Sequence, residues 1–517
     1  MNGAEALIQT LKDCGVDVCF ANPGTSEMQL VAAIDEQPGM RAILGLFEGV
    51  VTGAADGYGR MADKPAATLL HLGPGLGNGL ANIHNAKRAY TPMINIVGDH
   101  AVDHLQYDAP LTSDIAGLAS PMSDWVRVSS SASDLALAGA EAFAEAMSYP
   151  GRVATVIAPA DHAWTDGAEP ASNKNLPETA KADEVDIEQA AIALKKGGKP
   201  VLFLGSSALR EDALVQAGRI AAATGARLVC ETFSARLERG AGRVAVEKLP
   251  YFGEMAAEFI KDSTSIVFVG AKPPVSFFAY PGKPSWLSPE EAELLQLADP
   301  RVDALDSLTR LANALAAPEE PANVQPAGVP PLAKGPLNPA ATGSVIANHI
   351  IGDCIVMDEA ATVGLPIFPM TQGAPKHDWL MLTGGSIGYG LPAALGASIA
   401  CPDRKVLALQ ADGSAMYTVQ ALWTMAREKC DIITIIFNNS SYAILNIELA
   451  RLGVANPGPK ALSLLDLTNP AINWVSISEG MGVPAVKVET AEELDAALDK
   501  AMSEKGPHLI EAIIGQS

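Results

Sequence analysis

The chain has 517 residues, of which 48% are hydrophobic, and it carries a formal net charge of −23 at pH 7. This length predicts about three domains with sizeable cores, and the negative charge argues against nucleic acid or an anionic membrane as a partner. No apolar run is long enough to span a bilayer, and the N-terminus lacks the pattern of a signal peptide. The six cysteines show no CxxC spacing, so we expect reduced core thiols in a cytoplasmic protein.

Short apolar runs that end on turn residues alternate with helical patterns along the whole chain. Such alternation predicts parallel sheets with helices on both faces. In chain order the runs lie at 16–24, 41–49, 66–75, 93–100, 200–207, 226–232, 265–271, 354–360, 406–414, 433–439 and 507–514.

Two segments interrupt this alternation and indicate how the chain is divided. Residues 165–183 are polar without a hydrophobic period, and residues 316–343 are rich in Pro, Ala and Gly, so both are typical of surface linkers. The fold class we expect is therefore α/β, with three doubly wound domains that contain mainly parallel sheets. Their predicted boundaries are 1–164, 184–316 and 340–517.

One candidate site lies where two predicted strands end, at Asp412 and at Asn439. A strand at 405–410, a helix at 415–428 and the next strand form a right-handed βαβ unit, which brings both residues to the same carboxyl edge of one sheet. Carboxylate and amide oxygens, completed by phosphate and water, are how Mg²⁺ is usually held. The alternative is an ordinary strand-to-helix turn followed by a chance Asn pair, but the joint pattern favours a clamp for Mg²⁺ and a diphosphate.

Further candidates lie in the first third of the chain. Glu48 sits between an apolar run and a helix of small residues, where on its own it also fits a first-turn acid stabilised by the helix dipole. His71 ends a strand and precedes alternating glycines that lack the GxGxxG dinucleotide spacing. The alternative for His71 is a purely structural role. Thr25 is a further candidate, and the alternative there is a tight turn made by the preceding Pro and Gly.

These motifs resemble the superfamily of thiamine-diphosphate-dependent enzymes that contains pyruvate decarboxylase and acetohydroxyacid synthase. The resemblance rests on Asp-Gly-Ser followed by Asn-Asn, and on a glutamate followed by a helix with Ala-Asp-Gly-Tyr-x-Arg. Ala411 stands where the family usually has glycine. The likeness covers the whole chain and is strongest to benzoylformate decarboxylase and to acetolactate-synthase-like proteins. It implies an N-terminal domain for the pyrimidine of the cofactor, a central domain, and a C-terminal domain for the diphosphate and Mg²⁺.

The resemblance also implies roles for individual residues. In the family a glycine carbonyl accepts the aminopyrimidine N–H and an apolar residue wedges under the cofactor; without the family that residue, Ile387, would simply be core. The implied catalytic residues are Glu48, His71 and Thr25. The implied cofactor-binding residues are Glu48, Gly385, Ile387, Asp412, Gly413, Ser414, Asn439, Ser441 and Tyr442, and the implied metal ligands are Asp412, Asn439 and the main chain at Ser441.

The function implied is a decarboxylase or carboligase that acts on a small 2-oxo acid and depends on thiamine diphosphate and Mg²⁺. Ile387 favours the decarboxylases, because acetohydroxyacid synthases usually carry methionine there. The alternatives are an acetolactate synthase, with or without FAD in the central domain, and a non-catalytic relative that acts as a binding subunit. A homodimer or homotetramer is implied, since family sites lie between two chains.

Several positions depart from the family pattern and leave the substrate open. Phe277 and Phe278 stand where benzoylformate decarboxylase has a second active-site histidine, and Leu445 replaces a glutamate of pyruvate decarboxylase. Four polar residues are candidates to replace those missing groups, namely His100, His104, Asp108 and Glu448, and it is left open whether any of them does so.

Overall fold

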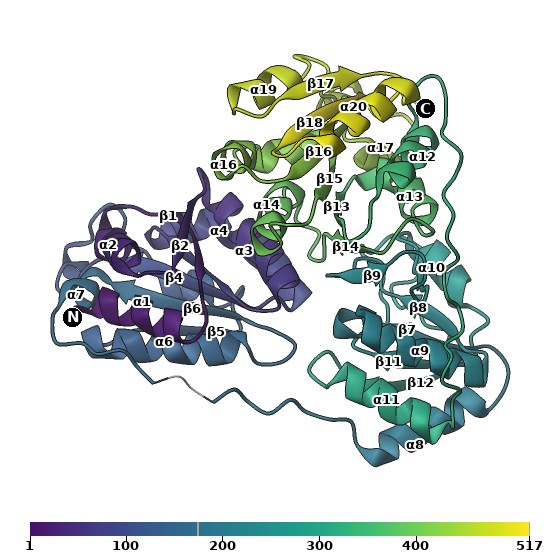
Figure 1. The fold of residues 1–517 in the computed structure, drawn as a ribbon, viewed down its shortest axis with the longest axis horizontal. Helices are drawn as coiled ribbons and strands as arrows, with labels where there is room; N and C mark the ends of the chain where they lie inside the picture. Colours follow the sequence, from purple (N-terminus) through teal and green to yellow (C-terminus); the bar gives the residue numbers. More distant parts are fainter. Residues whose placement is uncertain (173–174, 516–517) are drawn as a thin grey trace.

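The structure is a computed structural model that describes residues 1–172 and 175–515. Within these residues the named strands form three sheets, which we call the N-terminal, middle and C-terminal sheets. Figure 1 shows the three units around a common centre, with helices on the faces of each sheet. The α/β fold class predicted from the sequence is confirmed.

The N-terminal sheet is parallel throughout, with the order β2-β1-β3-β4-β6-β5. Its central strands are buried on both faces, which explains their continuous apolar sequences. The strands are β1 (Val18–Asn22), β2 (Arg41–Leu44), β3 (Ala66–Leu70), β4 (Met93–Asp99), β5 (Trp125–Val128) and β6 (Val153–Pro159).

The middle sheet is also parallel, with the order β10-β8-β7-β11-β12. Its strands are β7 (Pro200–Leu204), β8 (Arg227–Cys230), β10 (Glu247–Lys248), β11 (Ser265–Val269) and β12 (Glu293–Ala298).

The C-terminal sheet has the order β17-β18-β16-β15-β13-β14-β9 and is parallel except at its last strand. That strand, β9 (Leu237–Arg239), comes from the middle part of the chain and pairs antiparallel with β14 (His377–Met381). The other strands are β13 (Ile355–Glu359), β15 (Val406–Ala411), β16 (Ile432–Asn438), β17 (Ala485–Val488) and β18 (His508–Ile513).

Helices follow most strands, as expected for doubly wound units. The first helix begins with a capping box in which the Asn2 side chain accepts from the Glu5 N–H, and the Glu5 side chain accepts from the Asn2 N–H. The helices of the N-terminal part are α1 (Gly3–Asp13), α2 (Met28–Glu36), α3 (Glu48–Ala62), α4 (Leu72–Ala89), α5 (Ile115–Ala119), α6 (Ala132–Ala146) and α7 (Ala160–Trp164). Those of the middle part are α8 (Glu184–Lys195), α9 (Glu211–Thr224), α10 (Gly253–Ile260) and α11 (Ala304–Ala314). Those of the C-terminal part are α12 (Pro339–His349), α13 (Ala361–Met370), α14 (Gly390–Ala400), α15 (Asp412–Ala415), α16 (Ala421–Glu428), α17 (Ala443–Arg451), α18 (Pro459–Ser463), α19 (Trp474–Gly480) and α20 (Ala491–Ser503).

Helices α3 and α14 join the N-terminal unit to the C-terminal unit (Figure 1). Helix α14 is apolar on all sides and almost entirely buried, as expected for a helix inside a core. A Cβ at Gly57 would lie 2.1 Å from the Ala393 carbonyl oxygen, and one at Gly396 would lie 1.8 Å from that of Ala54. These two glycines therefore allow the helix backbones to touch, and this contact fixes the position of α3, whose first residue is Glu48.

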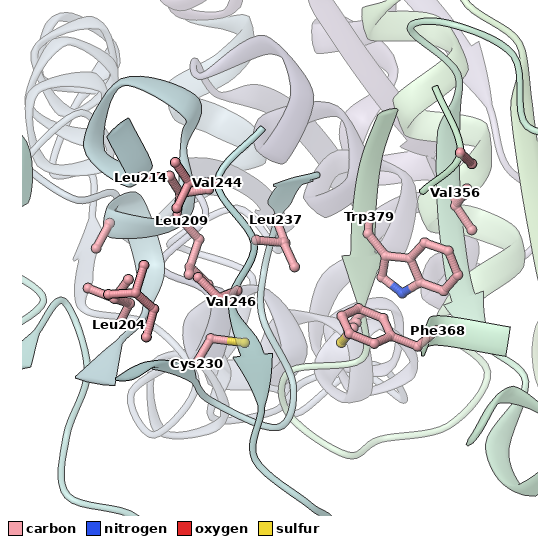
Figure 2. Close-up of a cluster of buried hydrophobic side chains, with 14 of the residues drawn as sticks. Leu204, Leu209, Leu214, Cys230, Leu237, Val244, Val246, Val356, Phe368 and Trp379 are labelled. Atoms are coloured by element: carbon pink, nitrogen blue, oxygen red, sulfur yellow. The ribbon is translucent and has the colours of Figure 1, made fainter. Parts of the chain in front are cut away.

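A second apolar contact joins the middle unit to the C-terminal unit. Figure 2 shows Leu237 and Val246 from the middle unit facing Phe368 and Trp379 from the C-terminal unit. The buried side chains of both units form one cluster, so β9 extends the C-terminal sheet without opening a gap in the core.

The predicted domain boundaries, 1–164, 184–316 and 340–517, stay a prediction. Residues 316–343 lack helix and strand until α12 begins at Pro339, and two residues of the predicted linker 165–183, at 173 and 174, lie outside the described residues. Two details differ from expectation. Strand β9 leaves the middle span to join the C-terminal sheet, and the helix predicted over 415–428 is broken into α15, a 3-10 turn and α16.

Five of the six cysteines are buried, in agreement with their interpretation as core thiols. Burial raises the pKa of the Cys19, Cys354 and Cys430 thiols to about 12, which keeps them protonated and unreactive. None of the helices in the described part of the chain is long and apolar enough to cross a membrane.

Candidate active site

Asp412 lies at the carboxyl edge of the C-terminal sheet, where β15 ends and α15 begins. Its Oδ1 accepts the N–H of Gly413 at 2.8 Å, and its Oδ2 accepts the N–H of Ser440 at 2.7 Å. Ser440 follows the neighbouring strand β16, so the structure brings the two predicted strand ends together. The amide of Asn439 is held in the same way, because its Oδ1 accepts the N–H of Ser441 at 3.0 Å.

The loop after β16 is tied by a residue that the sequence analysis missed, Asn438. Its Oδ1 accepts both the N–H and the hydroxyl of Ser440 at 3.0 Å, and its Nδ2 donates to Glu511 on β18 at 2.7 Å. The hydroxyl of Ser441 donates to the Leu465 carbonyl, so the backbone of the loop is fixed from two sides. The Asn-Asn pair was the available signal, since the first asparagine orients the turn that presents the second.

Gly413, Ser414 and Tyr442 gather beside Asp412. A Cβ at Gly413 would lie 2.4 Å from the Tyr442 ring, so only glycine permits this close packing. The Ser414 hydroxyl donates to the Ala411 carbonyl, which keeps the side chain at the start of α15.

The chemistry of this site fits a divalent cation with few carboxylate ligands. Burial raises the pKa of Asp412, and in the described part of the chain only main-chain N–H groups, without a cationic side chain, counter that shift. An ionised carboxylate buried in this way requires a counter-charge. No cluster of three or more His, Cys, Asp or Glu suited to a metal occurs among the described residues. One carboxylate with amide and main-chain oxygens is a donor set that suits Mg²⁺ bound to a diphosphate.

Gly385 and Ile387 lie on the loop between β14 and α14. Gly385 has φ +75°, and a Cβ there would lie 2.6 Å from the ring of Phe277. The same loop is fixed to α4 by Asn85, whose Nδ2 donates to the Ser386 carbonyl at 2.8 Å. Ile387 is 38% exposed, so this large apolar side chain is not core. It is available to pack against a bound molecule.

Glu359, at the end of β13, is a further residue that the sequence analysis missed. Its buried carboxylate accepts N–H groups from Gly388 at 2.7 Å, Tyr389 at 3.1 Å and Gly390 at 2.7 Å. The N-terminus of α14 stabilises this negative charge. Glu359 thereby fixes the loop that carries Gly385 and Ile387.

Glu48 lies at the carboxyl edge of the N-terminal sheet, as the first residue of α3. It is 9% exposed, and its Oε2 accepts the side-chain N–H of Asn78 on α4 at 3.0 Å. Gly75 on α4 separates Glu48 from His71. A Cβ built at Gly75 would lie 3.2 Å from the Glu48 Oε1 and 3.4 Å from the His71 Cβ. The structure therefore brings Glu48 and His71 to one place.

His71 is paired with a buried carboxylate that the sequence analysis did not consider. Its Nδ1 lies 2.8 Å from the Oε2 of Glu27, which is fully buried, whereas the His71 side chain is 24% exposed. Glu27 ends the 3-10 turn Thr25–Glu27, so the turn that carries Thr25 also carries the partner of His71. Thr25 itself is exposed at this edge. All three predicted catalytic residues therefore share the carboxyl edge of the N-terminal sheet.

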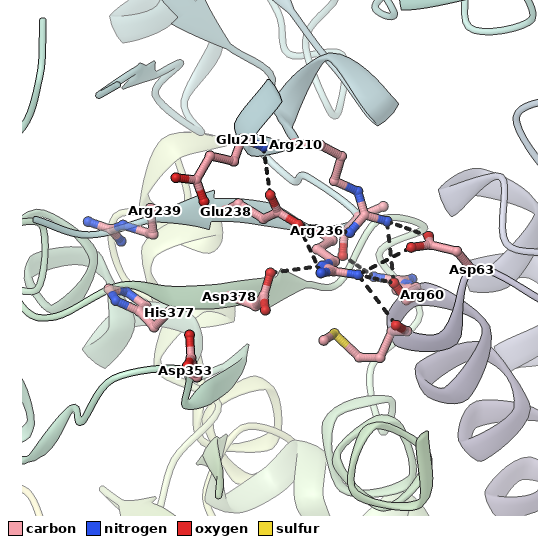
Figure 3. Close-up of polar contacts among 12 residues, drawn as sticks. Arg60, Asp63, Arg210, Glu211, Arg236, Glu238, Arg239, Asp353, His377 and Asp378 are labelled. Atoms are coloured by element: carbon pink, nitrogen blue, oxygen red, sulfur yellow. Dashed lines mark hydrogen bonds and ion pairs between the residues drawn. The ribbon is translucent and has the colours of Figure 1, made fainter. Parts of the chain in front are cut away.

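The helix motif that begins with Glu48 continues into a polar contact among all three units. Arg60 forms a buried ion pair with Asp56 at 2.8 Å and donates to the carbonyls of Met381 at 2.7 Å and Ala235 at 3.2 Å. Figure 3 shows Arg236 beside it, bonded to Asp378 on β14 at 2.8 Å. These residues hold the units together and do not face Glu48.

The two candidate edges are not bonded to each other within the described residues, where no hydrogen bond or ion pair links Glu48, His71 or Thr25 to Asp412 or Asn439. The two sets of residues lie on separate sheets.

The parts of the chain that carry the two edges both match known protein families. Two models of thiamine pyrophosphate enzymes match the chain, the N-terminal TPP binding domain over residues 1–118 and the C-terminal TPP binding domain over residues 368–512. The chain is also 53% identical over 515 residues to a Mycobacterium tuberculosis protein named "Putative acetolactate synthase large subunit IlvX", with 99% of both chains covered. The chain belongs to the thiamine pyrophosphate enzyme family. The resemblance inferred from its motifs is confirmed.

Other members of the thiamine pyrophosphate enzyme family match over the whole chain. Benzoylformate decarboxylase of Pseudomonas aeruginosa is 28% identical over 539 residues, with 98% of this chain and 97% of that protein covered. The solved structure of a thiamine diphosphate-dependent 4-hydroxybenzoylformate decarboxylase from Rhodococcus jostii superposes with a TM-score of 0.87 at 24% identity, covering 100% of both chains. This superposition confirms the three-domain fold.

The positions that depart from the family pattern are placed as follows. Leu445 on α17 is 45% exposed, and Glu448 accepts the hydroxyl of Tyr280 at 2.6 Å. The rings of His100 and His104 lie 5.3 Å apart at an angle of 53°, on the segment after β4, which belongs to the N-terminal unit. Two departures touch predicted cofactor-binding residues: Phe277 lies against Gly385, and the Leu445 N–H donates to the Tyr442 carbonyl at 2.9 Å.

Proposed function

We propose that the chain is a thiamine-diphosphate- and Mg²⁺-dependent lyase or carboligase that acts on 2-oxo acids. The observation that carries this proposal is the pair of edges, one with Asp412 and Asn439 held by main-chain donors, the other with Glu48 and His71 held by side chains. The first arrangement suits a bound cation and the second suits proton transfer.

In this proposal Asp412, Asn439 and the main chain at Ser441 hold Mg²⁺, while three neighbours contact the diphosphate. The donor set supports this assignment, because Asp412 is buried and lacks a cationic partner among the described residues. The residues proposed for the diphosphate are Gly413, Ser414 and Tyr442.

Thiamine diphosphate, when bound, supplies a nucleophilic carbon and an electron sink for decarboxylation. The residues of the chain would bind the cofactor and the substrate and would transfer the protons. Glu48 would hold a proton at its carboxyl group against a pyrimidine nitrogen, and the Gly385 carbonyl would accept the amino group. The exposed Ile387 would support the cofactor from below, His71 would move protons at its ring, and Thr25 would bind the substrate carboxylate with its hydroxyl.

A second candidate within the same chemistry is a carboligase of the acetolactate synthase type. It is favoured by the name of the relative that is 53% identical, whereas Ile387 and the benzoylformate decarboxylase match favour release of an aldehyde. The two differ in the acceptor of the acyl unit and share the site residues.

We further propose that the active unit is a homodimer or homotetramer in which the two edges meet across chains. The support is that the edges are not bonded to each other within the described chain, and that large apolar side chains are exposed around the C-terminal edge. Such patches mark interaction surfaces. They include Ile387, Met416, Tyr417 and Leu445.

The proposal is tested by supplying purified protein with thiamine diphosphate, Mg²⁺ and a panel of 2-oxo acids that includes pyruvate, 2-oxobutyrate and benzoylformate. Release of CO₂ is measured with and without aldehyde acceptors, and the products are identified by mass spectrometry. An aldehyde product supports the decarboxylase and a 2-hydroxy-2-alkyl-3-oxo acid supports the synthase. Tight cofactor binding without CO₂ from any 2-oxo acid would contradict both and support a non-catalytic relative.

A further inference from the structure

We propose that Glu27 is the positioning residue for His71, and that it holds the Nδ1 side of the ring so that Nε2 is the nitrogen that takes up and releases the proton. This inference rests on the proposed function, because it assigns the reacting atom of a residue in that site. It adds a residue to which the motifs gave no role.

The geometry is that of a buried carboxylate behind a partly exposed imidazole. The Glu27 Oε2 lies 2.8 Å from the His71 Nδ1 and also accepts the N–H of Gly24 at 2.7 Å. The Glu27 side chain is 0% exposed and that of His71 is 24% exposed. The carboxylate therefore contacts only the inner side of the ring, and a molecule that arrives from solvent meets His71 first.

The surrounding backbone is shaped to admit this pair. A Cβ at Gly24 would lie 2.3 Å from the His71 Nδ1, and a Cβ at Gly98 would lie 1.7 Å from the Glu27 Oε1. Any residue other than glycine at these two positions would push the ring or the carboxylate out of place. The turn after β1 and the end of β4 thus both provide space for the dyad.

A carboxylate at the buried position of Glu27 lowers the stability of the fold unless it has a further role. Burial raises the pKa of Glu27, opposed by the Gly24 N–H and by His71. Its Oε1 has no hydrogen-bond partner among the described residues. A buried charge with one unpaired oxygen is destabilising, and an apolar side chain of similar size would pack more favourably. The arrangement is explained if the charge serves His71.

The proton balance of the pair determines which nitrogen reacts. With one proton lost, an ionised Glu27 accepts Nδ1–H and leaves Nε2 as a bare acceptor. When the pair gains that proton, Nε2 carries a hydrogen and can donate it. This holds whether the proton between Nδ1 and Glu27 lies on the ring or is shared with the carboxylate. The Nδ1 side stays bonded to Glu27 in both states, so Nε2 alternates between base and acid.

Other ionisable groups approach the pair from neighbouring elements. The Glu48 Oε1 faces it across Gly75 on α4, and Asp99 and His100 follow Gly98 at the end of β4. Burial raises the pKa of Asp99, which the His100 N–H opposes. None of these groups is hydrogen-bonded to His71 in the described chain, so Glu27 is the partner to test.

The test is NMR of the full chain with ¹³C,¹⁵N-histidine in a deuterated background, with the His71 signals assigned from His71→Gln. In the wild type, the ring nitrogen and Cδ2 shifts are expected to report the Nδ1–H tautomer at the alkaline end of the titration. In Glu27→Gln, which keeps the size of the side chain, the His71 titration should move to lower pH. At a fixed pH the ratio of charged to neutral ring should then fall about tenfold or more.

Glu36→Gln at the exposed end of α2 is the matched control, because it removes the same charge from the same region. It should leave the His71 signals unchanged. A wild-type Nε2–H tautomer, or the same titration in wild type and Glu27→Gln, would overturn the proposal; if Glu27→Gln does not fold, the wild-type tautomer alone decides. The readout needs no substrate, so a chain that lacks activity on 2-oxo acids would contradict the proposed function and leave the dyad standing.

Discussion

The carboxyl edges of the N-terminal and C-terminal sheets have the same architecture and opposite chemistry. At the C-terminal edge, main-chain N–H groups hold the oxygens of Asp412 and Asn439. At the N-terminal edge, side chains hold the acids, with Asn78 on Glu48 and His71 on Glu27. Main-chain donors cannot lose their protons, so they fix ligand oxygens; a carboxylate paired with a histidine can exchange one. In our proposal the C-terminal edge therefore holds ligands in place, and we call it the static edge, whereas the N-terminal edge moves a proton, and we call it the proton-transferring edge.

The middle sheet provides a third edge with neither arrangement. A cavity of about 550 Å³ lies there, lined among others by Lys87, Arg88, Lys272 and Glu231. The Glu231 Oε1 accepts one long hydrogen bond, from the Ser206 N–H at 3.3 Å. Its carboxylate is therefore less well satisfied than the acids at the other two edges.

The largest effect is expected at the static edge. Asp412→Ala removes the only proposed carboxylate ligand, so Mg²⁺-dependent binding of thiamine diphosphate should weaken by more than about 100-fold. Calorimetric titration with and without EDTA measures this loss. Asp403→Ala, on the exposed turn before the same strand, is the control and should bind like wild type. Equal binding in Asp412→Ala and wild type would show that the static edge is misassigned.

A smaller loss is expected from the residue that orients this edge. Asn438→Ala removes the acceptor for Ser440, and loss of such an orienting bond typically weakens metal affinity about 10–100-fold. Mg²⁺ titration at saturating thiamine diphosphate measures the change, with circular dichroism to verify folding. Glu511→Gln, whose amide oxygen can still accept from Asn438, should change affinity less. An Asn438→Ala protein with unchanged Mg²⁺ affinity would place the loop geometry elsewhere.

Mixing variants tests whether the two edges meet across chains. Glu48→Gln damages only the proton-transferring edge and Asp412→Ala only the static one. In a mixed dimer one of the two sites would have both edges intact, so random mixing should restore about a quarter of wild-type activity. The measurement is CO₂ release after co-expression. Activity no higher than the sum of the separate variants would contradict a shared site.

Much of this arrangement could be predicted from the sequence, because the apolar runs end where the strands end. The runs over 18–22, 66–70 and 432–438 are strands, and Asp412 and Asn439 were expected side by side for that reason alone. Strand β9 could not be predicted. It has only three residues, too few to show a clear pattern, and its partner strand, β14, lies beside it only in the folded chain.

Two of the missed site residues, Glu27 and Glu359, were missed for the same physical reason. Glu27 lies 44 positions from His71 and ends a three-residue turn that carries no periodic signal. Glu359 likewise binds a loop, the one that contains Gly388, which only tertiary packing brings to it. Ile387 is the opposite case. Without the family resemblance it is expected in the core, but in the structure its side chain is 38% exposed. Pairings between distant loops depend on the packing of whole units, which local sequence does not encode.

The smallest effect concerns the middle edge. Burial raises the pKa of Glu231 from 4.5 to about 7. The folded state therefore binds more protons than the unfolded state between these pH values, and its stability falls as pH rises through this window. Because Glu231 is partly exposed, we expect the fall to be about 1 kcal/mol. Denaturation midpoints from pH 4.5 to 7.5 should lose this component in Glu231→Gln and keep it in the exposed control Glu290→Gln; the same pH profile in both variants would refute it.

The central claim is that Glu48 transfers a proton to the cofactor bound at the other edge. The most direct measurement is hydrogen–deuterium exchange at C2 of bound thiamine diphosphate, followed by acid quench and NMR, in wild type, Glu48→Gln and the control Glu36→Gln. We expect Glu48→Gln to retain cofactor binding, because Asp412 and Asn439 are intact, and to exchange about 10²–10⁴-fold more slowly, since the amide cannot deliver the proton. Equal exchange rates in wild type and Glu48→Gln would contradict the account and leave Glu48 as a first-turn acid of α3.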